Sequence, residues 1–117
     1  PLRVLSGLRK TLRRGSKVAL MTSRMGSIGD NGSGGYYGYR MSKAALNAAG
    51  MSLTRDLQPE GVAVAILHPG YVKTEMTGNA GGISPDEAAS QLLARYDELT
   101  LETSGRFLHA NGEVLPW

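Results

Sequence analysis

The sequence has no cysteine among its 117 residues. Without thiols the chain can form neither a disulfide framework nor a thiolate metal site, and this fits a reducing compartment. The longest uninterrupted apolar run, Val62–Leu67, is far too short to cross a bilayer, and no signal peptide is visible. We therefore expect a cytoplasmic protein without a membrane partner.

Acidic residues are missing from the first part of the chain, although the net charge of the whole is only +3. The basic side chains there surround the apolar positions of a helical pattern, as a solvated helix face does, and no aromatic residues interleave with them. This pattern argues against a nucleic-acid partner. His68 and His109 do not form a ligand set with a nearby pair of carboxylates, so no metal site is expected. The basic residues in question are Arg3, Arg9, Lys10, Arg13, Arg14 and Lys17.

A hydrophobic content of 41% can support a core, so the length fits one small domain or part of a larger one. The chain begins with Pro1 and is at once in helix-like sequence, which predicts that a preceding segment is missing.

Helical patterns alternate with short apolar runs that are typical of strands buried on both faces. This alternation predicts an α/β fold, an open sheet of parallel strands with right-handed crossovers. Ligands bind at the carboxyl ends of the strands in such sheets. Helices are expected over 1–14, 39–57 and 85–99, strands over 17–22, 61–67 and 105–109, and a turn at 111–112.

Two elements carry further expectations. The helix over 39–57 is rich in small residues, which predicts close packing against a sheet or another helix; they are Ala44, Ala45, Ala48, Ala49 and Gly50. The helix after Ser84 has an N-cap Ser, a Pro at its first position and a Glu at its third. It is expected to bury Ala88, Ala89, Leu92, Leu93 and Tyr96.

Tyr39 and Lys43 lie four residues apart at the start of the helix over 39–57, and therefore on one face of it. A fixed cation one turn away would stabilise the phenolate form of the tyrosine, which suits it for proton transfer. The same spacing also fits a surface tyrosine and a solvated lysine. The context favours chemistry, because Ser23 follows the first strand and Pro69-Gly70 follows the second, so all these residues should open onto one rim of the sheet.

A loop over 24–38 separates Ser23 from Tyr39 and holds six of the 16 glycines. Loops of this length in compact domains are often functional. Tyr36 and Tyr37 either line the mouth of a substrate site or pack the loop. Trp117 is expected to be a packed C-terminal anchor.

These motifs resemble the C-terminal half of the short-chain dehydrogenase/reductase family, whose fold is a doubly wound Rossmann-type sheet. Thr22-Ser23-Arg24-Met25-Gly26 is similar to the segment of its catalytic serine, and Tyr39 with Lys43 to its Tyr-x-x-x-Lys motif. Pro69-Gly70-Tyr71-Val72-Lys73-Thr74 is similar to its Pro-Gly motif. The stretches 39–47 and 67–70, with the ending 111–117, look most like the C-factor-like and sniffer-type carbonyl reductases. The resemblance covers the whole chain.

The resemblance implies an NAD(P)-dependent oxidoreductase that acts on a carbonyl or alcohol substrate, with either NAD or NADP as cofactor. It implies that Tyr39 donates the proton, that Lys43 binds the nicotinamide ribose and that Ser23 holds the substrate oxygen. Together with Tyr39 and Lys43, the cofactor-binding positions would be Pro69, Gly70, Val72 and Thr74, with the Val72 backbone and the Thr74 hydroxyl on the nicotinamide carboxamide.

The sequence departs from the family pattern in two ways. The Gly-rich nucleotide-binding half and the catalytic Asn would lie before Pro1, so residues 1–117 are expected to be a single partial domain. Ser23 stands 16 residues before Tyr39, more than is usual, and Ser27 is its rival. The alternative to an enzyme is a C-factor-like signalling or binding protein, or an inactive fragment. The family resemblance also implies a possible homodimer through the helices at 1–14 and 39–57.

Overall fold

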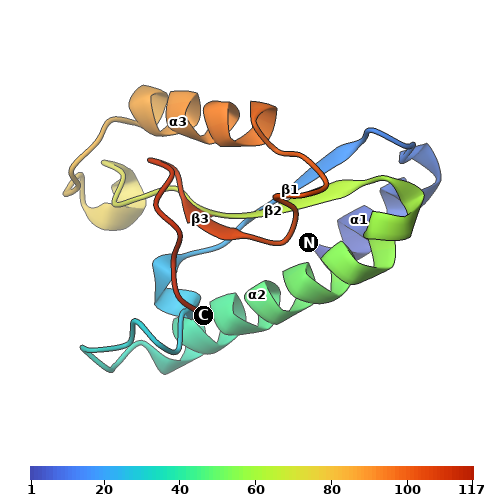
Figure 1. Ribbon diagram of the computed structural model, residues 1–117. Helices are drawn as coiled ribbons and strands as arrows, with labels where there is room; N and C mark the ends of the chain where they lie inside the picture. Colours follow the sequence, from blue (N-terminus) through green and yellow to red (C-terminus); the bar gives the residue numbers. More distant parts are fainter.

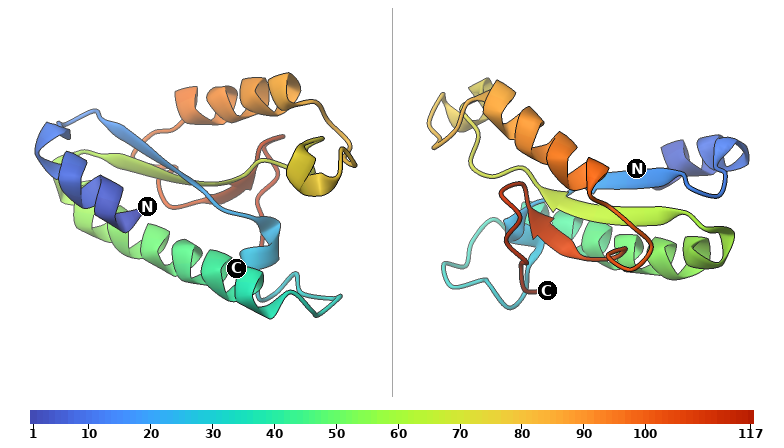
Figure 2. Two further views of the ribbon diagram at one scale, coloured as in Figure 1. Left: turned by 180° about the vertical axis from the view of Figure 1, so that it is seen from behind. Right: turned by 45° about the horizontal axis from the view of Figure 1, so that its top comes forward.

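The computed structural model describes all residues from Pro1 to Trp117. Three parallel strands form one sheet, with β2 (Ala63–His68) between β1 (Lys17–Met21) and β3 (Phe107–His109). Figures 1 and 2 show this order from several sides. The α/β class and the parallel sheet predicted from the sequence are confirmed, and the strand bounds differ by no more than two residues.

The two longer helices cover opposite faces of the sheet, α2 (Tyr37–Leu57) on one and α3 (Pro85–Asp97) on the other (Figure 1). Successive strand residues point to opposite faces, so both sets of β2 side chains are buried. This burial on both faces explains why Val62–Leu67 is an uninterrupted apolar run. On the α2 side the core holds Leu20, Val62, Val64 and Leu57, and on the α3 side Ala63, Ala65, Leu67 and Leu99.

Gly50 brings α2 close to the sheet. A Cβ atom at this position would lie 2.6 Å from Ile66 Cδ1 and 3.2 Å from Leu20 Cδ1, so any larger residue would displace the Ile66 side chain. The expected close packing is thus confirmed here. It is wrong for Ala45 and Ala48, which are exposed because they lie on the solvent face of the helix.

The start of α3 is confirmed, because Ser84 Oγ accepts a hydrogen bond from the Glu87 N–H at 3.2 Å. Its predicted buried face is only partly right. Ala88 is buried, whereas Ala89 is exposed and the Leu93 side chain is 63% exposed. These two residues lie on the side of α3 that nothing in this chain covers.

The predicted helix over 1–14 is too long. The helix α1 spans only Leu2–Leu8, about two turns, and a 3₁₀ turn, η1 (Arg9–Thr11), follows it. Leu12 is then extended, with ψ 138°, and no residue of α1 is buried. A short helix gains most of its stability from tertiary packing, which is nearly absent here. Arg9 forms an ion pair with Glu60 in η3 (Gln58–Glu60).

The C-terminal segment turns back along β3. After the predicted turn at Asn111-Gly112, the His109 N–H donates to the Glu113 carbonyl and the Leu115 N–H to the Phe107 carbonyl, both at 2.9 Å. The Trp117 ring stacks on buried Phe107, with ring centres 5.4 Å apart, so the expected anchor role is confirmed. No helix of the chain is long and apolar enough to cross a membrane.

Candidate active site

Tyr39 and Lys43 lie on one face of α2, one turn apart. The Lys43 Nζ atom is 5.6 Å from the centre of the Tyr39 ring. The Tyr39 side chain is 41% exposed, and Lys43 is half-buried with no hydrogen bond or ion pair from its ammonium inside the chain. The predicted shared face is therefore confirmed, although α2 begins at Tyr37, two residues earlier than expected.

Ser23 is buried directly after β1, where it caps the 3₁₀ turn η2 (Arg24–Gly26). Its Oγ accepts a hydrogen bond from the Met25 N–H at 3.1 Å, while its own hydroxyl hydrogen has no acceptor in the chain. Ser27 is also buried, but it follows η2, and its Oγ accepts from the Asp30 N–H at 2.9 Å. Only Ser23 stands at the strand end.

The end of β1 is bound to α2 by contacts that the sequence analysis missed. The Thr22 hydroxyl donates to Asn47 Oδ1 at 2.6 Å, and both side chains are buried. A Cβ atom on Gly26 would lie 2.7 Å from the Lys43 carbonyl carbon, so η2 rests directly on that turn of α2. Ser23 is thereby held beside the helix turn that carries Lys43. The spacing of Asn47 four residues after Lys43 would have placed it on the same face.

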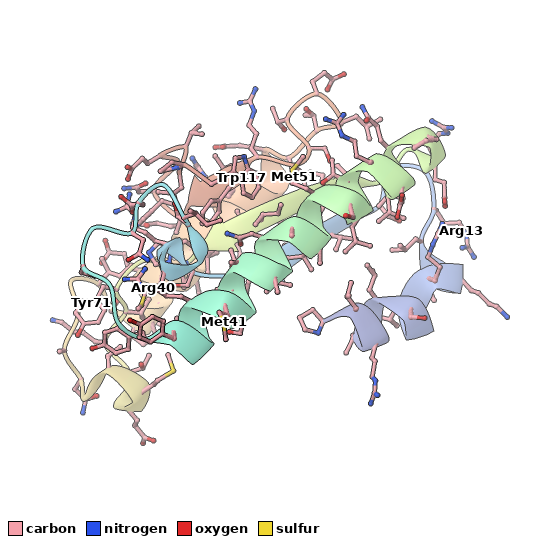
Figure 3. The ribbon with its side chains drawn as sticks, turned by 90° about the horizontal axis from the view of Figure 1, so that it is seen from below. Arg13, Arg40, Met41, Met51, Tyr71 and Trp117 are labelled. Carbon is pink, nitrogen blue, oxygen red and sulfur yellow. The ribbon has the colours of Figure 1, made fainter.

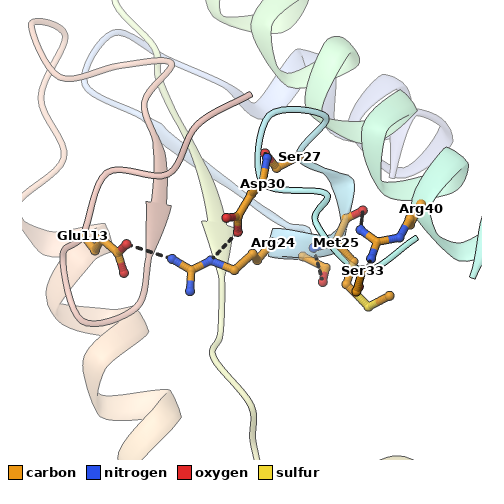
Figure 4. A network of polar contacts seen from close by, with 8 residues as sticks. Arg24, Met25, Ser27, Asp30, Ser33, Arg40 and Glu113 are labelled. Atoms are coloured by element: carbon orange, nitrogen blue, oxygen red, sulfur yellow. Dashed lines mark hydrogen bonds and ion pairs between the residues drawn. The ribbon is translucent and has the colours of Figure 1, made fainter. Parts of the chain in front are cut away.

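The Gly-rich loop is held by two arginines (Figure 4). From α2, Arg40 donates to the Ser33 hydroxyl at 3.0 Å and to the Gly35 carbonyl at 3.1 Å. From η2, Arg24 forms ion pairs with Asp30 at 3.0 Å and with Glu113 in the C-terminal segment at 2.8 Å. The loop is therefore attached to α2 through Arg40, and to η2 and the C-terminal segment through Arg24. Sequence reasoning missed these roles, because no periodic pattern in an irregular loop relates an arginine to its partners.

A hollow of about 330 Å³ opens between this loop and the first turns of α2. Tyr37 and Met41 line it from the helix, and Met25 and Ile28 line it from the loop side. Tyr36 and Tyr37 are 74% and 79% exposed, so they do not pack the loop. Figure 3 shows Arg40, Met41 and Tyr71 at this same end of the molecule.

The segment after β2 is braced by its own residues. Gly70 has φ +89°, a left-handed conformation that favours glycine. The Thr77 hydroxyl donates to the Val72 carbonyl at 2.9 Å and accepts from the Thr74 N–H at 3.0 Å. Thr74 is thus the N-cap of the 3₁₀ turn η4 (Glu75–Thr77), so this segment leaves β2 in a defined conformation.

His68 and His109 end β2 and β3 side by side. Their rings meet edge to face, with centres 4.9 Å apart and planes at 85°. Burial, together with the nearby His109 and Arg24, lowers the pKa of His68 to about 4. Burial and Arg24 also lower the pKa of His109. Both rings are therefore neutral at neutral pH.

The family model described as short chain dehydrogenase matches residues 7–82. The chain belongs to the short-chain dehydrogenase family. The Rossmann-type relationship predicted from the motifs is thereby confirmed.

Relatives and solved structures agree with this family. The whole chain aligns with 1-hydroxy-2-glutathionyl-2-methyl-3-butene dehydrogenase of Rhodococcus sp. (strain AD45) at 49% identity, and the alignment covers 54% of that protein. The whole chain also aligns with C-signal of Myxococcus xanthus at 46% identity, and the alignment covers 72% of that protein. It spans about half the length of the first of these.

Among solved structures, 86% of the chain superimposes on 41% of carbonyl reductase Sniffer of D. melanogaster, with TM-score 0.83 and 39% identity. NADPH-bound carbonyl reductase from chicken fatty liver gives TM-score 0.79 and 33% identity, over 86% of this chain and 42% of that one. The likeness to sniffer and to C-signal confirms the subgroup expected from the sequence.

Proposed function

We propose that this chain is the catalytic half of an NAD(P)-dependent oxidoreductase that interconverts a carbonyl and an alcohol. The observation that carries the proposal is the Tyr39–Lys43 pair, with Nζ 5.6 Å from the ring centre, at the rim where buried Ser23 follows β1. A phenol, an ammonium and a hydroxyl at one strand edge are the groups that proton transfer to a carbonyl oxygen requires.

The residues present fit a nicotinamide cofactor. The Lys43 ammonium has no partner within the chain, so its three N–H groups are free for the hydroxyls of a ribose. Gly70, with φ +89°, allows the turn that presents the backbone after β2 at this rim. The cofactor, when bound, supplies the hydride.

Each residue then has a defined role. Tyr39 Oη gives its proton to the substrate carbonyl oxygen during reduction and takes it back during alcohol oxidation. Lys43 stabilises the phenolate and binds the ribose, and the free hydroxyl hydrogen of Ser23 is donated to the substrate oxygen. Pro69 and Gly70 form the turn beside the nicotinamide, whose carboxamide would be held by the Val72 backbone and the Thr74 hydroxyl.

The relatives support this chemistry by their names, one a dehydrogenase and others carbonyl reductases, of which one was solved with NADPH. They leave the choice between NAD and NADP, and the substrate within the class of small carbonyl compounds, to experiment.

We further propose that the complete protein has a nucleotide-binding half next to β1. Only one edge of β1 is paired, and the Met21 side chain is 47% exposed on the sheet face opposite α2. An unpaired parallel edge of this kind promotes association. Residues 1–117 alone should therefore self-associate and bind NAD(P)H poorly. A monodisperse fragment with a cooperative melt and micromolar cofactor affinity would contradict this proposal.

The complete protein is also proposed to dimerise through α1 and the outer face of α2. Leu2, Val4 and Leu8 of α1 are all at least half exposed, and Ala45 and Ala48 offer a flat surface on α2. Light scattering should give a dimer at micromolar concentration, and a monomer there would count against the proposed interface.

The proposed activity is tested with the complete protein and a panel of aldehydes and ketones. Oxidation of NADH or NADPH should depend on the added carbonyl compound, and either cofactor should raise the melting temperature. The second candidate is a signalling or binding role, which the 46% identity to C-signal favours. Absence of binding with both cofactors would support that role and contradict the enzyme.

A further inference from the structure

The two histidines at the strand ends have no part in the proposed chemistry, yet they lie beside the Pro69-Gly70 turn. His68 precedes this turn directly, and His109 is its partner in the register of β2 and β3. Because carboxyl ends of neighbouring parallel strands share one edge, the two rings stand at the rim where a ligand would sit.

The His109 ring is fixed in orientation. Its Nδ1 accepts a hydrogen bond from the Asn111 N–H at 3.0 Å, so the neutral ring carries its hydrogen on Nε2. The edge-to-face contact with His68 holds it from the other strand. Two independent contacts thus leave the ring little freedom.

The other edge of the ring lies against Gly70. A Cβ atom on Gly70 would be 3.2 Å from His109 Cε1 and 3.4 Å from Nε2, with Ile83 Cδ1 at 3.3 Å. A side chain at position 70 would therefore meet both the imidazole and Ile83, so the turn packs closely against these two groups. Since glycine has no side chain to restrict its own backbone, neighbouring groups decide which conformation the turn keeps.

We propose that His109 is a positioning residue that holds the Pro69-Gly70 turn in the conformation that receives the nicotinamide end of the cofactor. The inference rests on the proposed function for its ligand, while the contact between His109 and the turn does not depend on it. Its consequence is that loosening His109 weakens cofactor binding more than it slows the chemical step.

The neutral state of the ring is part of this role. A proton on Nδ1 would remove the acceptor for the Asn111 N–H. The charged and titratable groups that face the histidine pair are Arg24 from η2 and Glu113 after β3. Arg24 is paired with Asp30 and Glu113, and it opposes a second positive charge at His109. Acidification that protonates the pair should therefore push the charged ring away from Arg24 and release the turn, an effect that an uncharged ring at this position would not show.

Two substitutions separate the contacts of His109. In His109→Asn the side-chain oxygen can replace Nδ1 as acceptor, but the ring edge against Gly70 is lost. In His109→Phe a ring remains beside Gly70 and the acceptor is lost. In the complete protein we expect His109→Asn to raise the Kd for NADPH or NADH about tenfold, with kcat at saturating cofactor within threefold of wild type. His109→Phe keeps an uncharged ring beside Gly70, so it should bind within about threefold of wild type and lose the weakening of binding at acidic pH.

Amide hydrogen exchange of residues 70–73, without cofactor, provides a second readout. Exchange should be faster in His109→Asn than in wild type, with His109→Phe between them, while the melting temperatures show that all three fold. Unchanged exchange together with unchanged Kd in both variants overturns the positioning role. If exchange changes as expected but wild type binds neither cofactor, the proposed function fails and the role of His109 in holding the turn stands.

Discussion

Gly26 and Lys43 are in direct backbone contact, because a Cβ atom on Gly26 would lie 2.7 Å from the Lys43 carbonyl carbon. This contact joins the turn after Ser23 to the helix that carries Tyr39. The relative position of the proposed catalytic groups therefore depends on the absence of one methyl group.

Gly26→Ala should force η2 away from α2. The obstacle is main chain that cannot rotate aside, so we expect a loss of about 1–3 kcal/mol in unfolding free energy. Turnover in the complete protein should also fall, since Ser23 moves with η2. Gly32→Ala is the matched control, because a Cβ atom there meets nothing within 4 Å. Equal melting temperatures and rates for the two variants would show that the contact is unimportant.

The two buried serines provide the next prediction. Ser23→Ala removes a hydroxyl at the strand end, whereas Ser27→Ala removes one beyond η2. Each substitution deletes an acceptor for one backbone N–H, at Met25 and Asp30 respectively, so their costs in stability should be similar. Turnover should drop much further in Ser23→Ala. A larger drop in Ser27→Ala would reverse the assignment.

Lys43 is expected to serve both cofactor and tyrosine. Lys43→Ala should therefore raise the cofactor Kd and lower kcat together. Lys43→Arg should restore only part of either, since a planar fork does not replace a compact ammonium. Titration calorimetry and steady-state kinetics measure the two effects separately. Full rescue by arginine would mean that any positive charge suffices.

His68 makes stability depend on pH. Its pKa is about 4 in the folded protein, owing mainly to burial, and about 6.5 when unfolded. The unfolded state therefore binds more protons between these values, so stability is complete above about pH 6.5 and is lost as the pH falls toward about 4. We expect a loss on the order of 1–2 kcal/mol, because the ring stays partly exposed to solvent. Chemical denaturation at several pH values across this range measures how the free energy of unfolding changes with pH. This change should be smaller for His68→Asn than for wild type, and an equal change in both would contradict the assignment.

Local sequence signals predicted the features that local physics determines. The apolar run before His68 gave β2, Ser84-Pro85 gave the start of α3, and the four-residue spacing placed Tyr39 and Lys43 on one face. These depend on periodicity and capping within a few residues.

Features that depend on distant neighbours were missed or misjudged. The exposure of Leu93 depends on what covers the outer side of α3, and the short α1 reflects a lack of packing partners. The Thr22–Asn47 hydrogen bond and the contact of His109 with Gly70 join residues 25 and 39 positions apart. The sequence pattern within one helix or strand does not indicate which of its side chains will contact a residue of a different element.

The most direct test of the account is the turnover of Tyr39→Phe in the complete protein, on a carbonyl substrate verified with wild type. The substitution removes only a hydroxyl from a partly exposed ring, so fold and cofactor affinity should change little. Turnover should fall about 10²–10⁴-fold, as expected for loss of a positioned proton donor. Tyr37→Phe, on an even more exposed ring two residues earlier, should keep nearly full turnover. Near-normal turnover in Tyr39→Phe would show that this stretch is not the catalytic centre.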